Sequence, residues 1–394
     1  MKLKKKLISL ACLSVLSGTA AAQSNVEVFG VIDLGILSQT NLSNPAFGYL
    51  PNQKNMGTVL EMKDGGLGQS YWGIKGSEDL GGGLKASFNL QGNFQGNTGI
   101  GGGPNSSGTT SMFNQQANVG ISGDFGGVQV GRVISPIYWA FASTDVRKGA
   151  YFGSSLIGVV GMNSATGAFS GANSNAAVAA IFNDNAVVYN SPKFGGFSGS
   201  LEYTFGGVAG DNSASRQEAA TLMYGDDHLK VDALIYNGND DGVKASANPN
   251  GTNTNRLVQI GAMYTINDIS MGAGFFKGTN PSHTGAGVNP AALGGAVTSG
   301  DINMVNFGLG YRASVQANIT SGIYRIQDEN TSANRATMYV LGLDYALSKS
   351  TKWYLEGAAI SNAGSNMNLA AVYAVPVTAG TNTHAIMAGI RHFF

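Results

Sequence analysis

The sequence predicts an all-β protein: a sixteen-stranded antiparallel transmembrane β-barrel with short turns at one end and long loops at the other. Three observations carry this prediction. Polar and apolar residues alternate with a period of two in runs of about ten residues, the length that a tilted membrane-spanning strand needs. Short turns alternate with long loops along the chain. Charged residues make up 12 % of the chain, about half of the usual share of roughly 25 %.

The alternation is clearest between Leu84 and Phe94, where apolar residues occupy every second position and polar residues stand between them. The same pattern recurs over 26–36, 197–205 and 315–320. A soluble β-sandwich would also alternate, but its strands are usually five or six residues long. In the hydrocarbon of a membrane every backbone N–H and C=O group needs a hydrogen-bond partner. No stretch after the N-terminal 22 residues offers the eighteen consecutive apolar residues that a membrane-spanning helix would need. A closed barrel therefore fits the pattern.

Seven short turns and eight long polar loops divide the chain into sixteen strands. The turns are expected at 79–83, 124–127, 193–196, 225–228, 267–268, 312–314 and 348–351. The loops are expected at 39–67, 97–112, 133–184, 206–215, 238–254, 278–301, 327–334 and 362–383. The first strand (24–38) should lie beside the last (384–394), because closure removes unpaired strand edges.

The first 22 residues are typical of a cleaved signal peptide: lysines precede an apolar stretch (7–16), and small residues (20–22) supply a cleavage site. A lipoprotein anchor at Cys12 is the alternative, although the preceding residues fit a lipobox poorly. Cleavage before Gln23 would leave one barrel domain over 23–394. Loss of four lysines would give it a net charge of −4, which argues against a nucleic-acid-binding protein.

Four short motifs narrow the class of barrel. They read G-S-E-D-L-G-G-G-L at 76–84, V-Y-N-S-P-K-F-G-G-F at 188–197, Y-A-L-S-K at 345–349 and G-I-R-H-F-F at 389–394. In this order and spacing they resemble the general diffusion porins of β-proteobacteria and their relatives, over the whole mature chain.

The resemblance implies a homotrimer in the bacterial outer membrane, in contact with membrane lipid and lipopolysaccharide. Its water-filled channel would let small hydrophilic solutes and ions diffuse passively. The third loop, 133–184, would fold into the lumen as the constriction. Phe394 would be the assembly signal that the barrel presents to the insertion machinery.

A pore selects by its width and by the charges at its narrowest point. The wall candidates on polar parities are Glu27, Asp33, Lys75, Lys85 and Glu202, with Arg391 expected to face inward from the last strand. Arg132 joins them by family analogy. Its parity matches that of Val128 and Val130, so facing the lumen would need a slip at Gly131.

The third loop departs from the family in its charges. Asp145, Arg147 and Lys148 are the only charges of its first half, and 151–182 contains none. These three side chains are expected at the free rim as an ion filter. The charge-free half should pack against the inner wall or a trimer contact through Ile157, Val159, Val160, Phe169, Ile181 and Phe182.

The basic wall candidates favour a weak anion preference despite the net charge of −4. A substrate-selective channel is the main alternative, and an adhesin-like barrel is another. No enzyme is expected, because no G-x-S-x-G motif is present and the four histidines lack metal-ligand spacing. The glycine run at 99–103 lacks the lysine of a phosphate-binding loop. No cofactor or metal is therefore expected.

Overall fold

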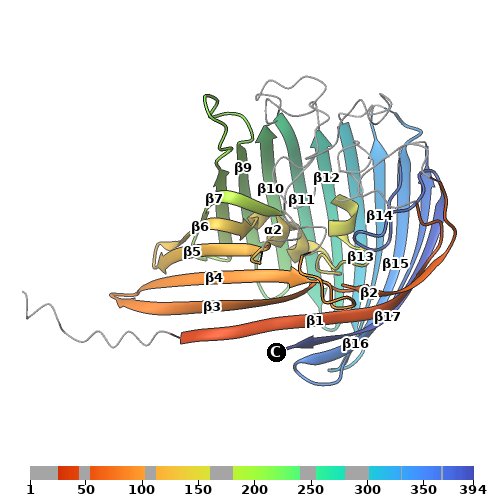
Figure 1. Ribbon diagram of the computed structural model, residues 1–394, viewed down its shortest axis with the longest axis horizontal. Helices are drawn as coiled ribbons and strands as arrows, with labels where there is room; N and C mark the ends of the chain where they lie inside the picture. Colours follow the sequence, from red (N-terminus) through yellow and green to blue (C-terminus); the bar gives the residue numbers. More distant parts are fainter. Residues whose placement is uncertain are drawn as a thin grey trace, which may run out of the picture.

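The computed structural model describes residues 25–43, 54–102, 112–159, 181–239, 254–279, 301–329, 331–364 and 367–394. The predicted signal peptide lies outside these residues and stays a prediction. The described chain forms a closed antiparallel barrel in which each strand pairs with the next in sequence (Figure 1). The predicted fold class is therefore confirmed. No helix in the described ranges is long and apolar enough to cross a membrane.

The strands are β1 Asn25–Gln39, β2 Val59–Asp64, β3 Ser70–Gly81, β4 Leu84–Phe94, β5 Gln116–Gly123, β6 Gly126–Ile134, β7 Phe182–Asn190, β8 Phe197–Thr204, β9 Gln217–Gly225, β10 Leu229–Asn239, β11 Thr254–Ile266, β12 Ile269–Thr279, β13 Asp301–Arg312, β14 Ala317–Asp328, β15 Arg335–Ala346, β16 Thr351–Ala363 and β17 Asn382–Phe393. All seven predicted turns fall between paired strands.

The first and last strands close the barrel. β1 pairs with β17 from Val31 opposite Phe393 to Gln39 opposite Ala385. Figure 1 shows the red β1 running beside the dark blue β17. The carbonyl and amide of Phe394 also bond to the backbone of Gly30. The expected neighbours are thus confirmed, and the edges that an open sheet would expose are paired.

The first predicted loop needs a correction, because part of it belongs to the wall. β2 and β3 both pair with β1, one after the other: Asp64 lies opposite Leu34, and Tyr71 lies opposite Val31. Residues 65–69 leave the wall between them. β2 and β3 therefore form a single interrupted strand, and the seventeen described segments make sixteen strands.

Side chains alternate between the outside and the inside of the wall, as β11 illustrates. Val258 and Ile260 are exposed, whereas Leu257 and Gln259 between them are buried. Successive side chains of a strand point to opposite faces, and in a membrane barrel the apolar face meets lipid. Exposed apolar residues are thus the outer surface of this fold.

The third loop begins with helix α2, Pro136–Thr144, which packs against β9 to β12 inside the barrel (Figure 1). Pro136 stands at the first helical position, where its fixed φ is favourable and no amide is needed. Ser135 does not cap the helix, because its hydroxyl donates to the carboxylate of Glu202 on β8. This bond ties the start of the loop to the wall.

The charge-poor half of the third loop packs inward. Ile157, Val159 and Phe182 are buried, and the first two belong to the main apolar cluster together with Met304 of β13. Ile181 packs against the same cluster. The predicted burial is confirmed for these residues. Ile157 and Val159 pack against the inner wall of the barrel, which is one of the two predicted places. Val160 and Phe169 lie outside the described residues.

Candidate functional site

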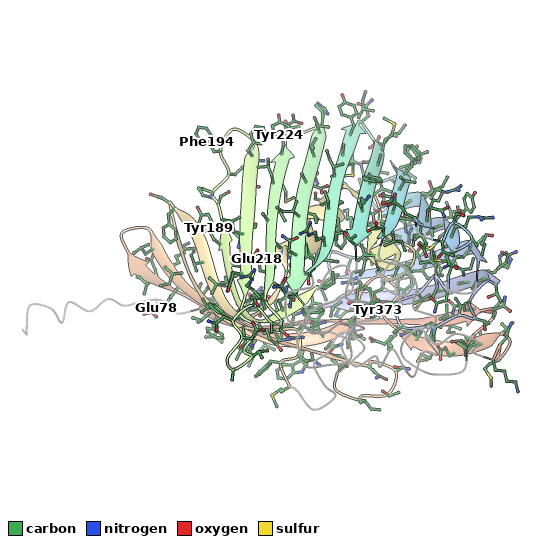
Figure 2. All side chains as sticks on the ribbon, turned by 90° about the horizontal axis from the view of Figure 1, so that it is seen from above. Glu78, Tyr189, Phe194, Glu218, Tyr224 and Tyr373 are labelled. Atoms are coloured by element: carbon green, nitrogen blue, oxygen red, sulfur yellow. The ribbon has the colours of Figure 1, made fainter. Side chains whose placement is uncertain are left out.

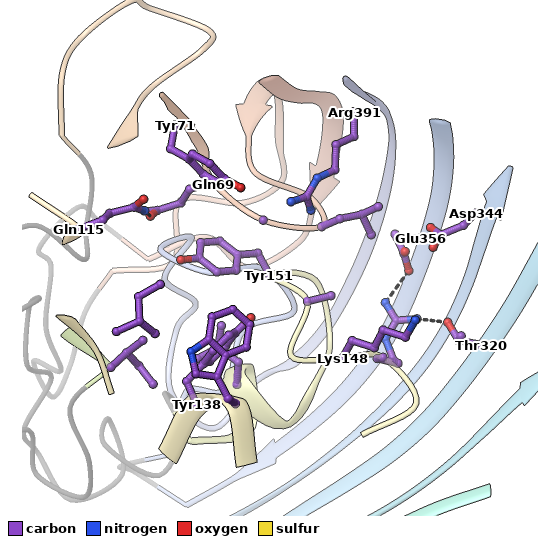
Figure 3. A pocket seen from close by; sticks show the side chains of 18 of the residues that line it. Gln69, Tyr71, Gln115, Tyr138, Lys148, Tyr151, Thr320, Asp344, Glu356 and Arg391 are labelled. Atoms are coloured by element: carbon purple, nitrogen blue, oxygen red, sulfur yellow. Dashed lines mark hydrogen bonds and ion pairs between the residues drawn. The ribbon is translucent and has the colours of Figure 1, made fainter. Parts of the chain in front are cut away.

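The described residues enclose a cavity of about 430 Å³ between the third loop and the wall (Figure 3). The loop contributes Tyr138, Trp139, Lys148 and Tyr151. The wall contributes glutamines on one side and charged side chains of β15 to β17 on the other (Figure 3). Burial raises the pKa of the Tyr138 phenol above its ordinary value.

Asp145 organises the third loop and does not face the pore. Its carboxylate accepts bonds from the amide of Arg147 at 3.0 Å, the amide of Ser155 at 2.8 Å and the hydroxyl of Tyr324 on β14 at 2.9 Å. The side chain is buried. The expectation that Asp145 stands at a free rim is therefore wrong, because neighbouring donors take up its carboxylate.

Arg147 is buried too, which corrects its expected rim position. Its guanidinium pairs with Glu356 of β16 at 2.6 Å and donates to the Thr320 hydroxyl at 2.7 Å (Figure 3). It also donates to the carbonyls of Phe152 and Gly153. Arg147 thus fastens the loop to the wall at the edge of the cavity.

Arg391 lines the cavity from β17, on the inward side that its parity predicted. Its guanidinium lies 3.5 Å from the carboxylate of Asp33. Asp33 is fully buried and also accepts bonds from Tyr354 and from the amides of 66–68. Asp33 is therefore buried and does not line the cavity: it holds the 65–69 segment against the wall and lies beside Arg391, its register partner on β17.

The remaining charges leave an excess of cations. Lys352 of β16 pairs with Asp344 of β15 at 3.3 Å. Lys148 is exposed in a tight turn, with a φ of 54°, and forms no ion pair with the residues that the structure describes. The described lining thus holds four basic side chains, Arg147, Lys148, Lys352 and Arg391, against the two carboxylates Asp344 and Glu356.

The eighth loop, between β16 and β17, folds against the third loop. The amide of Gly153 donates to Ala371 at 2.8 Å, and the amide of Tyr373 donates to Tyr151 at 2.9 Å. These bonds form a short antiparallel bridge between Phe152 and Val372. In Figure 2, Tyr373 lies well away from Phe194 and Tyr224, which mark the turn end of the wall. Two loops, rather than one, therefore occupy the barrel interior.

Three predicted wall residues lie away from the cavity. Glu27 and Lys75 form an ion pair at 3.4 Å near the start of β1, with both side chains about half exposed. Lys85 is exposed beside the turn between β3 and β4. The cavity lining includes none of the three.

Arg132 lies at an irregularity of strand β6, where the sequence required a slip for this side chain to face the lumen. The register of β6 and β7 shifts between Gly131 and Val133, and Gly131 has a φ of 125°. The guanidinium is buried, pairs with Asp184 and donates to the carbonyl of Asn114 at 2.8 Å. Arg132 is not part of the cavity lining. Glu202 is likewise buried, with Asn183 and Ser135 as its partners.

Sequence reasoning missed several lining residues. Asp344, Lys352 and Glu356 stand on the inward faces of β15 and β16, and their strand parity could have revealed them. The glutamines at 69, 91, 115 and 116 come from three separate stretches, so no periodic pattern groups them. Among the described residues, no three histidine or acidic side chains gather as metal ligands.

Comparisons with known proteins agree with this architecture. The family model described as "Gram-negative porin" matches residues 9–365. The chain belongs to the Gram-negative porin family. This porin is 29 % identical over 413 residues to outer membrane porin protein 32 of Delftia acidovorans, covering 100 % of both chains. It is 28 % identical over 399 residues to an outer membrane porin of Bordetella pertussis, covering 91 % of this chain and 95 % of that one.

Solved structures share the fold of the porin. An anion-selective porin from Comamonas acidovorans superposes with a TM-score of 0.71 at 21 % identity, over 94 % of this chain and 100 % of that one. The trimer form of OmpT from Vibrio cholerae superposes with a TM-score of 0.62 at 16 % identity, over 94 % and 99 % of the two chains. The porin is an outer-membrane channel for passive diffusion.

Proposed function

We propose that the cavity is the selectivity filter of this porin and that the channel weakly prefers anions. The observation that carries the proposal is Lys148, which is exposed in the cavity lining and forms no ion pair with the described residues, whereas Arg147, Lys352 and Arg391 each have a carboxylate partner. Distant charges matter less, because salt screens interactions beyond about 8 Å at physiological ionic strength. The local field at the filter therefore outweighs the net charge of −4 of the mature chain.

Several finer features of the proposal rest on the family and on the sequence. The porin is exported with residues 1–22 removed, is inserted through recognition of Phe394, and works as a homotrimer surrounded by lipid and lipopolysaccharide. Small hydrophilic solutes diffuse through its channel, and it catalyses no reaction. One Vibrio structure is named as a trimer, which supports the homotrimer by analogy, and the Comamonas structure is named as anion-selective, which supports the anion preference.

The test is the reversal potential of single channels in a potassium chloride gradient. The unmodified porin should give the sign of an anion-selective pore. Lys148→Glu should move the potential toward cation selectivity. Lys193→Glu, at the β7–β8 turn and outside the cavity lining, should leave it nearly unchanged. A cation-selective sign in the unmodified porin refutes the proposal.

A substrate-selective channel remains the second candidate, because amide and aromatic side chains line much of the cavity. Swelling of lipid vesicles in sugars of increasing size separates the two. A smooth decline with solute size indicates general diffusion, and a sharp preference for one solute indicates a specific site.

A further inference from the structure

The outer face of the wall carries basic side chains at its loop end, over strands β11 to β15. In the middle of these strands the outward positions are apolar, as Val258, Phe275 and Phe307 show. At the turn end they are aromatic or aliphatic, as at Tyr264 and Tyr311. At the loop end the outward positions of the described strands hold four exposed basic side chains, Arg256, Lys277, Arg325 and Arg335. Positive charge therefore marks one edge of this face.

Arg325 and Arg335 are neighbours on adjacent strands. Arg325 of β14 lies opposite Thr337 of β15, and Gln327 of β14 lies opposite Arg335. The two arginines are thus diagonal neighbours on one face of an antiparallel pair, at positions about 7–8 Å apart. Both lie beside the short loop that joins β14 to β15. Two like charges this close repel each other unless an anion lies between them.

The acidic side chains of this outer face do not neutralise the two arginines. Glu329 pairs with Lys277 at 3.1 Å and forms no ion pair with either arginine. Asp301 stands four residues along β13 from Val305, the residue opposite Arg325, which is roughly 13 Å along the strand. In the described part of the chain, neither arginine forms an ion pair. Their charge is therefore left for a partner outside the described chain.

The neighbouring loops supply no acid either, and the arginines lie at the level of lipid headgroups. The sequences of 280–300 and 364–381, the loops on either side of β13 to β16, contain no aspartate or glutamate. A charge on the lipid face is costly at the bilayer midplane and tolerated near the interface. Arg325 lies two residues beyond the exposed Ile323, about 7 Å along β14 and toward the loops. The headgroup region is thus where its charge is tolerated.

We propose that Arg325 and Arg335 form a docking site for a phosphorylated lipid of the outer leaflet, with a phosphate group held between the two guanidiniums. The inference rests on the proposed contact with lipopolysaccharide and assigns that contact to the β14–β15 face. A guanidinium presents a planar fork of donors that matches the oxygens of a phosphate. Ile323 and Tyr339 lie opposite each other next to the arginines and are exposed, so they meet the acyl chains.

The experiment measures binding of diphosphoryl lipid A to the full-length porin in detergent by native mass spectrometry. The same lipid with both phosphates removed is the comparison. The unmodified porin should bind the phosphorylated lipid about tenfold or more tightly than the dephosphorylated one. Equal binding of the two lipids overturns the site, whatever the variants do. Displacement of the lipid by an equal concentration of inorganic phosphate would reveal a site for free anions and also overturns it.

Arg325→Gln and Arg335→Gln should each lower the affinity for diphosphoryl lipid A about fivefold, the effect of one basic residue near an anionic membrane surface. Arg325→Lys keeps the charge but loses the planar fork, so its loss should be smaller. Lys349→Gln, at the β15–β16 turn on the opposite end of the wall, is the matched control and should leave the affinity unchanged. An equal loss in Lys349→Gln indicates attraction by overall charge and refutes the site. Single-channel conductance checks that each variant barrel is intact.

The outcomes separate this inference from the proposals before it. Absence of diphosphoryl lipid A binding by the unmodified porin refutes the proposed contact with lipopolysaccharide itself. Binding that both glutamine variants retain places the lipid elsewhere on the wall and refutes the site alone. Dissociation of the oligomer in either variant, with lipid binding unchanged, assigns this face to a subunit contact and refutes the site too. The filter is independent, because these side chains lie outside the barrel and the reversal potential in potassium chloride should not change.

Discussion

Arg147 of the third loop and Glu356 of β16 form a buried ion pair at 2.6 Å, with each side chain 2 % exposed. The guanidinium also donates to the Thr320 hydroxyl and to two loop carbonyls. A buried pair persists only where extra hydrogen bonds compensate the loss of water, and this one has them. The pair therefore fixes the position of the loop that narrows the channel.

Glu356→Ala should destabilise the porin strongly, because it leaves the Arg147 charge buried without a partner. Breaking a buried pair costs about 3–5 kcal/mol. Urea unfolding of the barrel in lipid vesicles measures the loss. Glu329→Gln is the matched control, since its pair with Lys277 is exposed and should contribute less than about 1 kcal/mol. Equal losses in the two variants would contradict the anchoring role of Glu356.

Tyr373→Pro should widen the channel, because proline has no amide to donate to Tyr151. The bridge between the eighth and third loops would then lose one of its two bonds, and single-channel conductance should rise. Tyr373→Phe is the control, since it keeps both the backbone amide and the ring that lies 4.9 Å from that of Tyr151. An unchanged conductance in the proline variant would show that the eighth loop does not limit the pore.

An arginine on the lipid face of β11 should cost stability according to its depth. Ile260 lies at the middle of the strand and Ile266 at its end, and both are exposed on the outer face. Ile260→Arg should cost about 2–4 kcal/mol and Ile266→Arg about 0–1 kcal/mol. Unfolding in vesicles measures both values. If the two costs are equal, the placement of β11 in the membrane is wrong.

Asp33→Asn should strengthen the anion preference severalfold. The change keeps the shape of the side chain but removes the negative charge 3.5 Å from Arg391, so the guanidinium acts on the cavity without an opposing charge. The reversal potential in a potassium chloride gradient gives the answer. A shift toward cations would mean that Arg391 leaves the cavity when Asp33 is neutral.

Much of the wall could be predicted because its signals are local. The alternation around Leu84–Phe94 and the short turns are properties of neighbouring residues, and a period of two specifies which face each side chain takes. The charge-poor half of the third loop is also informative by itself, since apolar residues such as Ile157 avoid water wherever the chain runs. The strand pattern predicted sixteen strands, whereas the in-folding of the third loop was implied by the family resemblance and agreed with these apolar residues.

The sequence by itself determined the barrel, its closure and the inward parity of Arg391. Only the tertiary structure decided which charges reach the channel. Asp145 and Arg147 look like exposed loop charges until Tyr324 and Glu356, about two hundred positions away, are placed beside them. Asp33 meets Arg391 through closure of the barrel, and the glutamines of the lining come from three separate stretches. Charge effects depend on distances of a few ångströms, and such distances between remote residues arise only from the folded arrangement.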